Sequence, residues 1–197
     1  MGDISKGEIG GSTPLRWIPA SIGRNCKMLR IDLETTLKRS IELQRETEKP
    51  KWAKLVWSRT CIPRHSFTMW LFMHSRLPVL QRIGRYTAIP STDYLMCQQG
   101  PETHEHLFFE CAYAKNIWNQ LCAEWNIILQ LEGKEAFITS LLKMSKPRKM
   151  RSLLQASVST VIYLIWLARN RKFFKNIIYP AQEILKETRR QLTQRVL

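Results

Sequence analysis

The stretch "DYLMCQQGPETHEHLFFEC", residues 93–111, contains two cysteines and two histidines. Zinc in proteins is usually held by four thiolates and imidazoles in a tetrahedron, which come from two short loops. His106 and Cys111, with four residues between them, have the spacing of one such pair. The other pair is incomplete, because Cys97 is present but Tyr94, a poor zinc ligand, stands at the first position of the C-x-x-C turn. The sequence therefore predicts a Cys/His loop that lacks one ligand.

Apolar residues recur at helical spacing on both sides of this loop. Before it, "SFTMWLFMH" predicts a helix over 66–76 with Ser66 as its N-cap, and a short helix is expected over 79–86. After it, "AYAKNIWNQLCAEW" predicts a strongly amphipathic helix over 112–125.

The rest of the chain is expected to be helical as well, because alternating strand patterns are scarce. Further helices are predicted over 28–46, 137–144, 151–175 and 181–194. The predicted fold is mostly α: a small helical domain around a Cys/His loop resembling a zinc knuckle, with N- and C-terminal helical extensions. We divide the chain into a flexible tail, an amphipathic helix, the Cys/His domain and a basic helical C-terminal region, at 1–27, 28–50, 51–125 and 126–197.

The charge of the chain points to a polyanionic partner. There are 31 Lys and Arg residues against 16 Asp and Glu, a net charge of +15. The segment from Lys146 to Leu197 holds twelve basic and two acidic residues. We expect RNA or DNA to bind without sequence preference, and the candidate contacts are Lys146, Arg148, Lys149, Arg151, Arg169, Arg171, Lys172 and Lys175. A solvated helical surface without a partner is the alternative.

Several classes of protein are disfavoured. Five cysteines, an odd number, and the lack of an apolar segment after the first residues argue against secretion. The longest apolar tract, "VIYLIWLA", is far shorter than the roughly 20 residues that cross a bilayer. We therefore expect an intracellular protein, nuclear or cytoplasmic, without a membrane partner. The three aspartates are scattered, so we expect neither two-metal catalysis nor a small-molecule substrate.

The segments "VWSRTCIPRHSFTMWLFMHSRLPVLQRIGRY" and "CQQGPETHEHLFFECAYAKNIW" closely resemble the zinc-binding domain that follows the reverse transcriptase in plant LINE-type (non-LTR) retrotransposons. The similarity extends from about Trp52 to Trp118. The resemblance implies zinc as the cofactor. It implies that Cys97, His106 and Cys111 are ligands, with Tyr94 where the family has a cysteine and His104 at a variable position.

Two interpretations of the loop remain open. Zinc is held by the three remaining ligands with His104 or water as the fourth, or the site is degenerate and free of metal. The expected function is a non-catalytic nucleic-acid-binding module derived from a retrotransposon reverse transcriptase polyprotein. The alternatives are an inert retrotransposon relic without a host function and a fragment of a nucleic-acid enzyme that lacks its catalytic part.

Overall fold

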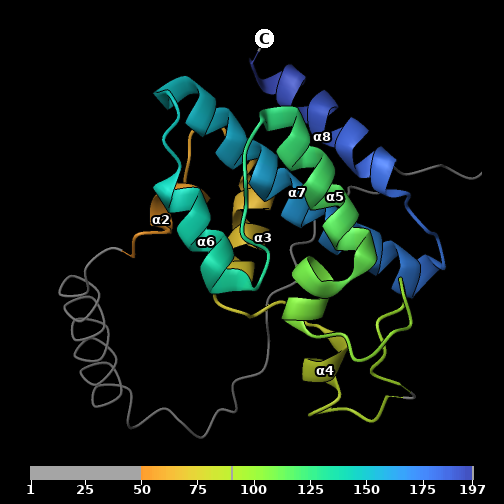
Figure 1. The fold of residues 1–197 in the computed structure, drawn as a ribbon. Helices are drawn as coiled ribbons and strands as arrows, with labels where there is room; N and C mark the ends of the chain where they lie inside the picture. The colour runs from red at the N-terminus through yellow and green to blue at the C-terminus, as the bar shows by residue number, and fades with distance from the viewer. Residues whose placement is uncertain (1–49, 90, 197) are drawn as a thin grey trace, which may run out of the picture. The chain divides into compact units, whose positions relative to one another are not determined.

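The structure, a computed structural model, describes residues 50–89 and 91–196 and is mostly helical over them (Figure 1). No strand occurs in these residues, where Asp93 and Pro101 form an isolated antiparallel bridge. The predicted fold class is confirmed, whereas the predicted tail 1–27 and the helix 28–46 lie outside the described residues. The elements are α2 (Ala53–Val56), α3 (Pro63–Met73), α4 (Leu80–Ile83), the π-helical turn η1 (His106–Glu110), α5 (Ala112–Trp125), α6 (Lys134–Lys143), α7 (Arg148–Lys175) and α8 (Ala181–Val196).

The long helix α7 is the centre of this unit. It runs diagonally behind α5 in Figure 1 and contacts α2, α3, η1 and α8. Among the described helices, α7 alone is long and apolar enough to cross a bilayer by length and composition. Of that apolar window, 56% is buried within the folded unit. A helix that is apolar on most sides is typical of a protein core as well as of a membrane span.

The start of α3 differs from the prediction in an instructive way. Helix α5 has the predicted bounds, but α3 begins at Pro63 rather than at Ser66. Proline suits the first helical turn, because its fixed φ is helical and the N–H it lacks would have no partner there. Ser66 is therefore buried inside the helix, and its assignment as the N-cap was wrong.

An aromatic core joins the Cys/His domain to the C-terminal region. Phe72 of α3 contacts Phe108 and Phe109 of η1, and Phe137 of α6 packs against Phe109 and Trp118 with ring centroids 5.0–5.3 Å apart. Trp118 Nε1–H donates to the carbonyl of Phe108 at 2.7 Å, which satisfies the buried indole. The segments predicted as 51–125 and 126–197 therefore share one hydrophobic core, because the aromatic face of the former is covered by helices of the latter.

Candidate metal centre and nucleic-acid interface

The loop that carries the first cysteine is folded back on itself by backbone hydrogen bonds. Tyr94 N–H donates to the carbonyl of Gly100 at 2.9 Å, and Gln98 N–H donates to the carbonyl of Tyr94 at 2.7 Å. Gln98 and Gly100 have positive φ values of 55° and 114°, and glycine takes such a conformation at little cost. This turn holds Cys97 in a half-buried position.

His106 and Cys111 are brought together by the π-helical turn η1. The hydroxyl of Thr103 accepts a hydrogen bond from His106 N–H at 2.9 Å, as an N-cap does. Cys111 N–H donates to the carbonyl of His106 at 3.1 Å, which is the i to i+5 bond of a π-helix. In an α-helix, residues five apart point about 140° away from each other around the axis. The π-turn therefore brings two side chains together that an α-helix would separate.

The donor atoms of Cys97, His106 and Cys111 all lie within 4.8 Å of one another. Cys97 Sγ is 3.2 Å from His106 Nε2. His106 Nδ1 is 3.0 Å from the carbonyl oxygen of Pro101. A carbonyl oxygen only accepts hydrogen bonds, so Nδ1 carries the proton and Nε2 presents its lone pair to the cluster. The structure thus brings together the three ligands that the sequence predicted.

This donor set fits zinc at three corners of a tetrahedron. Zinc–sulfur distances of about 2.3 Å and zinc–nitrogen distances of about 2.0 Å place tetrahedral ligands roughly 3.5–3.8 Å apart, which is compatible with the observed cluster. Within the described part of the chain, no fourth His, Cys, Asp or Glu joins the group. Burial raises the pKa of the Cys111 thiol, so metal binding has to displace a proton from it at neutral pH.

Tyr94 occupies the core beside this cluster. Its side chain is 0% exposed, and its ring meets the His106 ring edge-on with centroids 5.3 Å apart. Its hydroxyl is buried without a hydrogen-bond partner among the described residues. Burial raises the pKa of the Tyr94 phenol well above its ordinary value, so the neutral hydroxyl is a poor replacement for a thiolate. Tyr94 serves as a packing residue at this position.

His104, the alternative fourth ligand, is not part of the cluster that the structure assembles. It lies beside the backbone of Ser75 and Leu77, between α3 and α4. Burial lowers the pKa of His104 below its ordinary value, so the imidazole is neutral at physiological pH. Of the two fourth ligands expected from the sequence, the structure leaves water as the simpler one.

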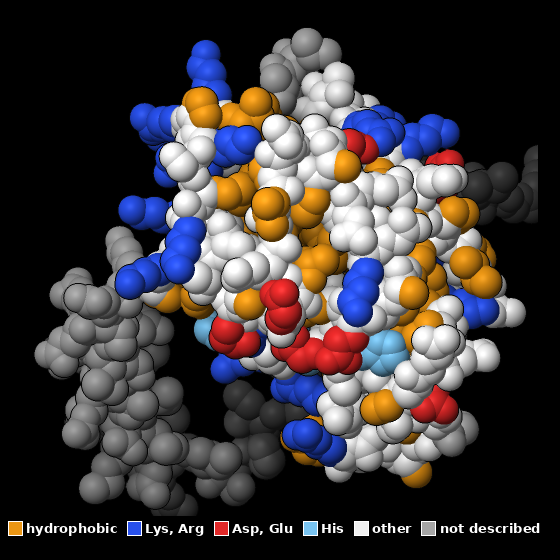
Figure 2. Space-filling model, in the orientation of Figure 1, with side chains coloured by type: hydrophobic (Ala, Val, Ile, Leu, Met, Phe, Trp, Pro, Cys, Tyr) orange, Lys and Arg blue, Asp and Glu red, His pale blue; other side chains and the backbone are white. Residues whose placement is uncertain are grey.

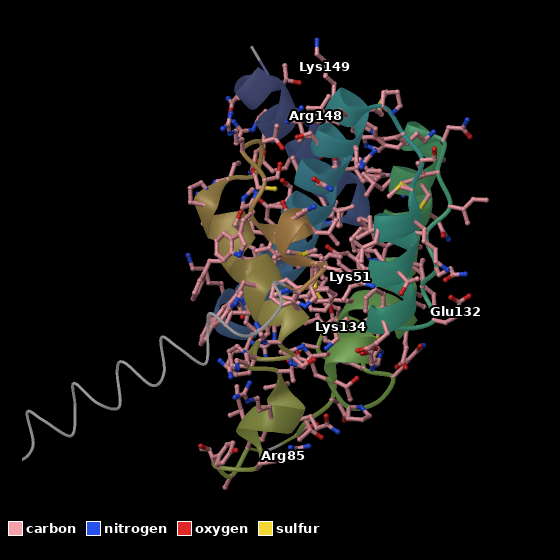
Figure 3. The ribbon with its side chains drawn as sticks, turned by 90° about the vertical axis from the view of Figure 1, so that its left-hand side faces the viewer. Lys51, Arg85, Glu132, Lys134, Arg148 and Lys149 are labelled. Atoms are coloured by element: carbon pink, nitrogen blue, oxygen red, sulfur yellow. The ribbon has the colours of Figure 1, made fainter. Side chains whose placement is uncertain are left out.

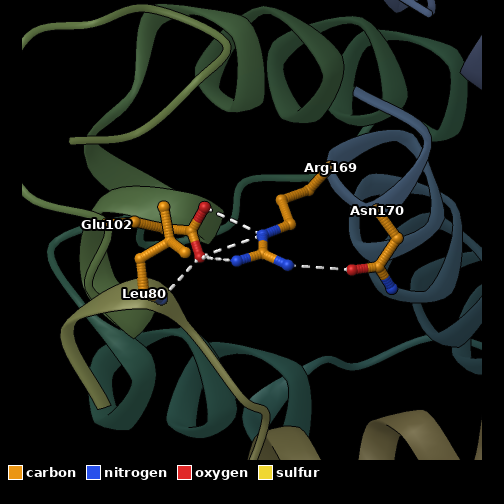
Figure 4. A network of polar contacts seen from close by, with 4 residues as sticks. All are labelled: Leu80, Glu102, Arg169 and Asn170. Carbon is orange, nitrogen blue, oxygen red and sulfur yellow. Dashed lines mark hydrogen bonds and ion pairs between the residues drawn. The ribbon is translucent and has the colours of Figure 1, made fainter. Parts of the chain in front are cut away.

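Arg169, predicted as a nucleic-acid contact, lies inside the protein. Its side chain is 3% exposed, and its guanidinium donates to both carboxylate oxygens of the fully buried Glu102 at 2.7–2.9 Å (Figure 4). Glu102 Oε1 also accepts a hydrogen bond from Leu80 N–H at 2.9 Å. A buried guanidinium that is already matched to a carboxylate cannot reach a phosphate, so this prediction was wrong. The sequence contains a signal of this burial, because Arg169 continues the apolar series of Ile162 and Ile165 at helical spacing.

The other predicted cations form two groups at opposite ends of α7. Because an α-helix rises about 1.5 Å per residue, the two groups are roughly 30 Å apart. Figure 3 shows Arg148 and Lys149 at the beginning of the helix, far from Arg85 near α4. The exposed Arg59 belongs to the same end, because Ser58 and Thr60 on either side of it contact Ser152 at 3.0–3.4 Å through their hydroxyls. We call this set the leading basic group: Arg59, Lys146, Arg148, Lys149 and Arg151. Sequence reasoning missed Arg59, since it is far away along the chain.

The second group, at the end of α7, is already engaged in local contacts. The Arg171 guanidinium lies 4.6 Å from the centroid of the Tyr179 ring, and Lys172 Nζ donates to Asn176 Oδ1 at 2.7 Å. Lys172 and Lys175 also stand in the last turn, where the helix dipole favours cations. The positions of Lys172 and Lys175 therefore have a structural explanation. In the leading basic group, Lys146 and Arg151 each donate to a backbone carbonyl at 3.2 Å, whereas the side chains of Arg148 and Lys149 form no hydrogen bond or ion pair with the described residues.

The surface is not uniformly basic. Figure 2 shows acidic side chains gathered on one face below the centre of the unit. A shallow hollow between η1 and the start of α6 is lined by four glutamates, Glu105, Glu110, Glu132 and Glu135. Burial raises the pKa of the Glu105 carboxyl. Phosphate would be repelled here, so an approaching polyanion is steered towards other faces.

Comparison with known proteins shows a family similarity for part of the chain. No curated protein and no solved structure matches the chain. Residues 36–118 match the family described as zinc-binding in reverse transcriptase. The matched range includes the cluster of Cys97, His106 and Cys111. It begins before residue 50, where the described part of the structure starts. The resemblance found in the sequence is confirmed at the level of this family. Over residues 36–118, less than half of its length, the chain is similar to the zinc-binding domain of reverse transcriptases.

Proposed function

We propose that this protein is a non-catalytic nucleic-acid-binding module, derived from a retrotransposon reverse transcriptase polyprotein, in which a zinc-binding loop organises the fold. The observation that carries the proposal is the leading basic group. Arg148, Lys149 and Arg151 are exposed, and no carboxylate of the described residues forms an ion pair with them. Uncompensated cations at one end of a helix bind a phosphate backbone without reading its sequence.

The residues that would hold zinc are Cys97, His106 and Cys111, with water as the fourth ligand. Bound zinc would supply a cross-link between the 93–101 loop and the start of α5. The chain prepares this site through three contacts of its own. Pro101 fixes the His106 tautomer, Thr103 caps the turn before it, and η1 presents Cys111 on the same side. A site with three protein ligands binds metal less tightly than a closed structural site of four.

The absence of catalysis is proposed on the distribution of carboxylates. Two-metal chemistry needs acidic side chains that converge on the ions. Within residues 50–89 and 91–196, the group of metal-ligating side chains close enough to hold an ion is the thiol and imidazole cluster. Glu102, the buried carboxylate nearest to it in sequence, is already bound to Arg169.

A fold kept without its metal is the second candidate, and Tyr94 favours it. The Tyr94 ring is fully buried against His106, so the core at this position is filled whether or not metal is bound. An inert relic of a retrotransposon would have no reason to keep an uncompensated basic surface. The two candidates therefore differ in whether the leading basic group acts.

Filter binding of a 30-nucleotide RNA and the matching DNA, at several salt concentrations, tests the proposal. Arg148 and Lys149, both replaced by Gln, should weaken binding to each single strand and reduce the salt slope by about 1.4. The control replaces Arg82 and Arg85, two exposed cations in and just after α4, by Gln. It removes the same charge and should leave the slope within about half a unit. Equal effects of both variants, or no binding by the natural protein, would refute the proposal.

A further inference from the structure

A cavity of about 430 Å³ lies between α3, α7 and α8, on a different part of the unit from the cysteine cluster. Its volume is in the range of pockets that take a small ligand, roughly 300–1,000 Å³. Four cations and two carboxylates line it, together with two tyrosines and Gln191. The cations of this cavity outnumber its carboxylates, so that two cations remain after the carboxylates are paired.

The two carboxylates of the cavity are already paired along α8. Glu187 binds Arg190 at 2.6 Å, and Glu183 lies 3.7 Å from Lys186. The remaining two cations, Arg64 and Arg171, have no carboxylate at ion-pair distance within the described part of the chain. Each instead lies over a tyrosine ring, at 5.4 Å from the centroid of Tyr163 and 4.6 Å from that of Tyr179. Such a guanidinium keeps its N–H groups for an anion while the ring supports its flat face.

Gln191 provides an independent sign of a ligand. Its side chain is 7% exposed and lines the cavity. Its Nε2 donates to Glu187, which fixes the orientation of the amide, while its Oε1 is buried without a hydrogen-bond partner among the described residues. A buried acceptor left unsatisfied costs free energy, so a ligand that brings an N–H or O–H donor would remove that cost.

We propose that this cavity binds one nucleotide, with its phosphate at Arg64 and Arg171, its base against Tyr179, and a base or ribose donor at Gln191 Oε1. Planar guanidinium groups match phosphate oxygens. Bases stack on aromatic side chains in proteins that bind single strands. Tyr179 is the ring available to a base, because Tyr163 is held between His65, stacked at 4.3 Å, and Arg64. Phenyl phosphate has a ring and a phosphate but no N–H or O–H donor beside the ring for Gln191, so it is the probe that lacks the third contact.

The nucleotide can be free or part of a strand, and the two sources are separated by the choice of probe. Titrations of the isotope-labelled protein with the four nucleoside 5′-monophosphates, ribose 5-phosphate and phenyl phosphate are followed by NMR, with the Gln191 side-chain amide as the reporter. The monophosphates should bind at least about fivefold more tightly than ribose 5-phosphate, the lower end of what one stacked base contributes. A short single-stranded oligonucleotide should shift the same amide if the site also takes nucleotides within a strand. Binding of phenyl phosphate as tight as that of the nucleotides would overturn the inference.

Three variants distinguish the site from general electrostatic attraction. Arg171→Gln should weaken nucleotide binding about tenfold or more, as the loss of a charge-assisted contact does. Lys175→Gln removes the same charge from an exposed position one turn away and should change it less than about twofold, since no direct contact is lost. Gln191→Met should weaken binding while the free protein keeps its melting temperature, because an unsatisfied acceptor disappears together with one hydrogen bond. Equal losses in the two charge variants, or unchanged binding by Gln191→Met, would overturn the inference.

This inference builds on the proposed nucleic-acid binding but can fail separately from it. If the 30-nucleotide strand binds through the leading basic group while no nucleotide shifts the Gln191 amide, the proposed function stands and the cavity inference falls. If nucleotides bind in the cavity while the strand does not bind, the cavity inference stands and the proposed function falls.

Discussion

The guanidinium of Arg169 and the carboxylate of Glu102 form a buried ion pair between the middle of the sequence and the central helix. Their side chains are 3% and 0% exposed, and the shortest contact is 2.7 Å. Glu102 lies between Cys97 and His106 along the chain, and it also binds the first N–H of α4 (Figure 4). The pair therefore connects α7 to the loop that holds the candidate metal ligands. A helix outside the residues matched by the family thus helps to position the Cys/His loop.

Breaking this pair should destabilise the protein strongly. Arg169→Met leaves a buried carboxylate and Glu102→Leu a buried guanidinium, and each is expected to lower the free energy of unfolding by about 3–5 kcal/mol. The double variant leaves no buried charge, so its loss should be clearly smaller than the sum of the two single losses. Urea unfolding of the four proteins measures the coupling. Additive losses would show that the two side chains act independently.

Tyr94→Cys should complete a Cys₃His site and tighten zinc binding. The thiolate would stand three residues before Cys97, opposite His106 and Cys111. Loss of the buried ring should destabilise the metal-free protein by about 3 kcal/mol, whereas bound zinc contributes directly to the stability of the fold. We expect one tightly bound zinc per chain and a melting temperature that falls sharply on addition of a chelator.

Tyr94→Ser is the matched control for that variant. It removes the same ring and adds no thiolate, so it should show the loss of stability without the gain in zinc affinity. Metal analysis and calorimetry with and without chelator compare the two. If both variants hold zinc equally well, the side chain at this position is not a ligand, and the closed four-ligand site cannot be restored there.

Sequence patterns predicted the helices more reliably than they predicted which charged groups are exposed. The bounds of α5 follow directly from its apolar spacing, because one face of that helix meets the core. The π-turn at His106 could not be foreseen, since it depends on one extra residue between His106 and Cys111 within an apolar run. Arg169 was predicted at the surface but is buried, whereas the exposed Arg59 was not predicted as part of the basic surface. Whether a charge is buried or joins a surface group depends on residues that are distant in sequence.

The metal-free protein should lose stability at alkaline pH. Burial is the main cause that raises the pKa of four groups, Tyr94, Cys111, Tyr113 and Cys122. The folded state keeps their protons at pH values where the unfolded chain releases them, from about pH 8.5 for thiols and about pH 10 for phenols. Their contribution to stability is therefore fully present below these values and is lost progressively as the pH rises above them towards the raised pKa values of the folded state.

Zinc should remove part of this sensitivity, because a coordinating thiol is already deprotonated at neutral pH. Urea unfolding at pH 7, 8.5 and 10, with and without a chelator, compares the two states. We expect the free energy of unfolding to fall more steeply between pH 7 and 10 in the chelated protein. Cys122→Ser should reduce the slope of both states equally, since Cys122 is not in the cluster. A chelated protein that is as stable at pH 10 as at pH 7 would contradict the prediction.

The leading basic group should lower stability where it aids binding. The first turn of α7 contains basic residues and no acidic one, although the positive end of the helix dipole disfavours cations there. Lys149→Glu replaces a cation, which the positive end of the helix dipole disfavours, by an anion, which it favours. It should raise the free energy of unfolding by about 0.5–2 kcal/mol, which corresponds to an increase of roughly 1–8 °C in the melting temperature of a unit of this size. The same change should weaken nucleic-acid binding and reduce its salt slope by at least about 0.7.

Lys175→Glu is the mirror-image control at the other end of the same helix. It makes the same change of charge, but in the last turn, where a cation is favoured and an anion is not. Its melting temperature should therefore fall, and its effect on nucleic-acid binding should be the smaller of the two, because it lies outside the leading basic group. Thermal unfolding and filter binding of both variants separate the two contributions. If Lys149→Glu loses stability as Lys175→Glu does, an unrecognised contact of Lys149 supports the fold, and the cations at the start of α7 are retained for folding rather than for binding a polyanion.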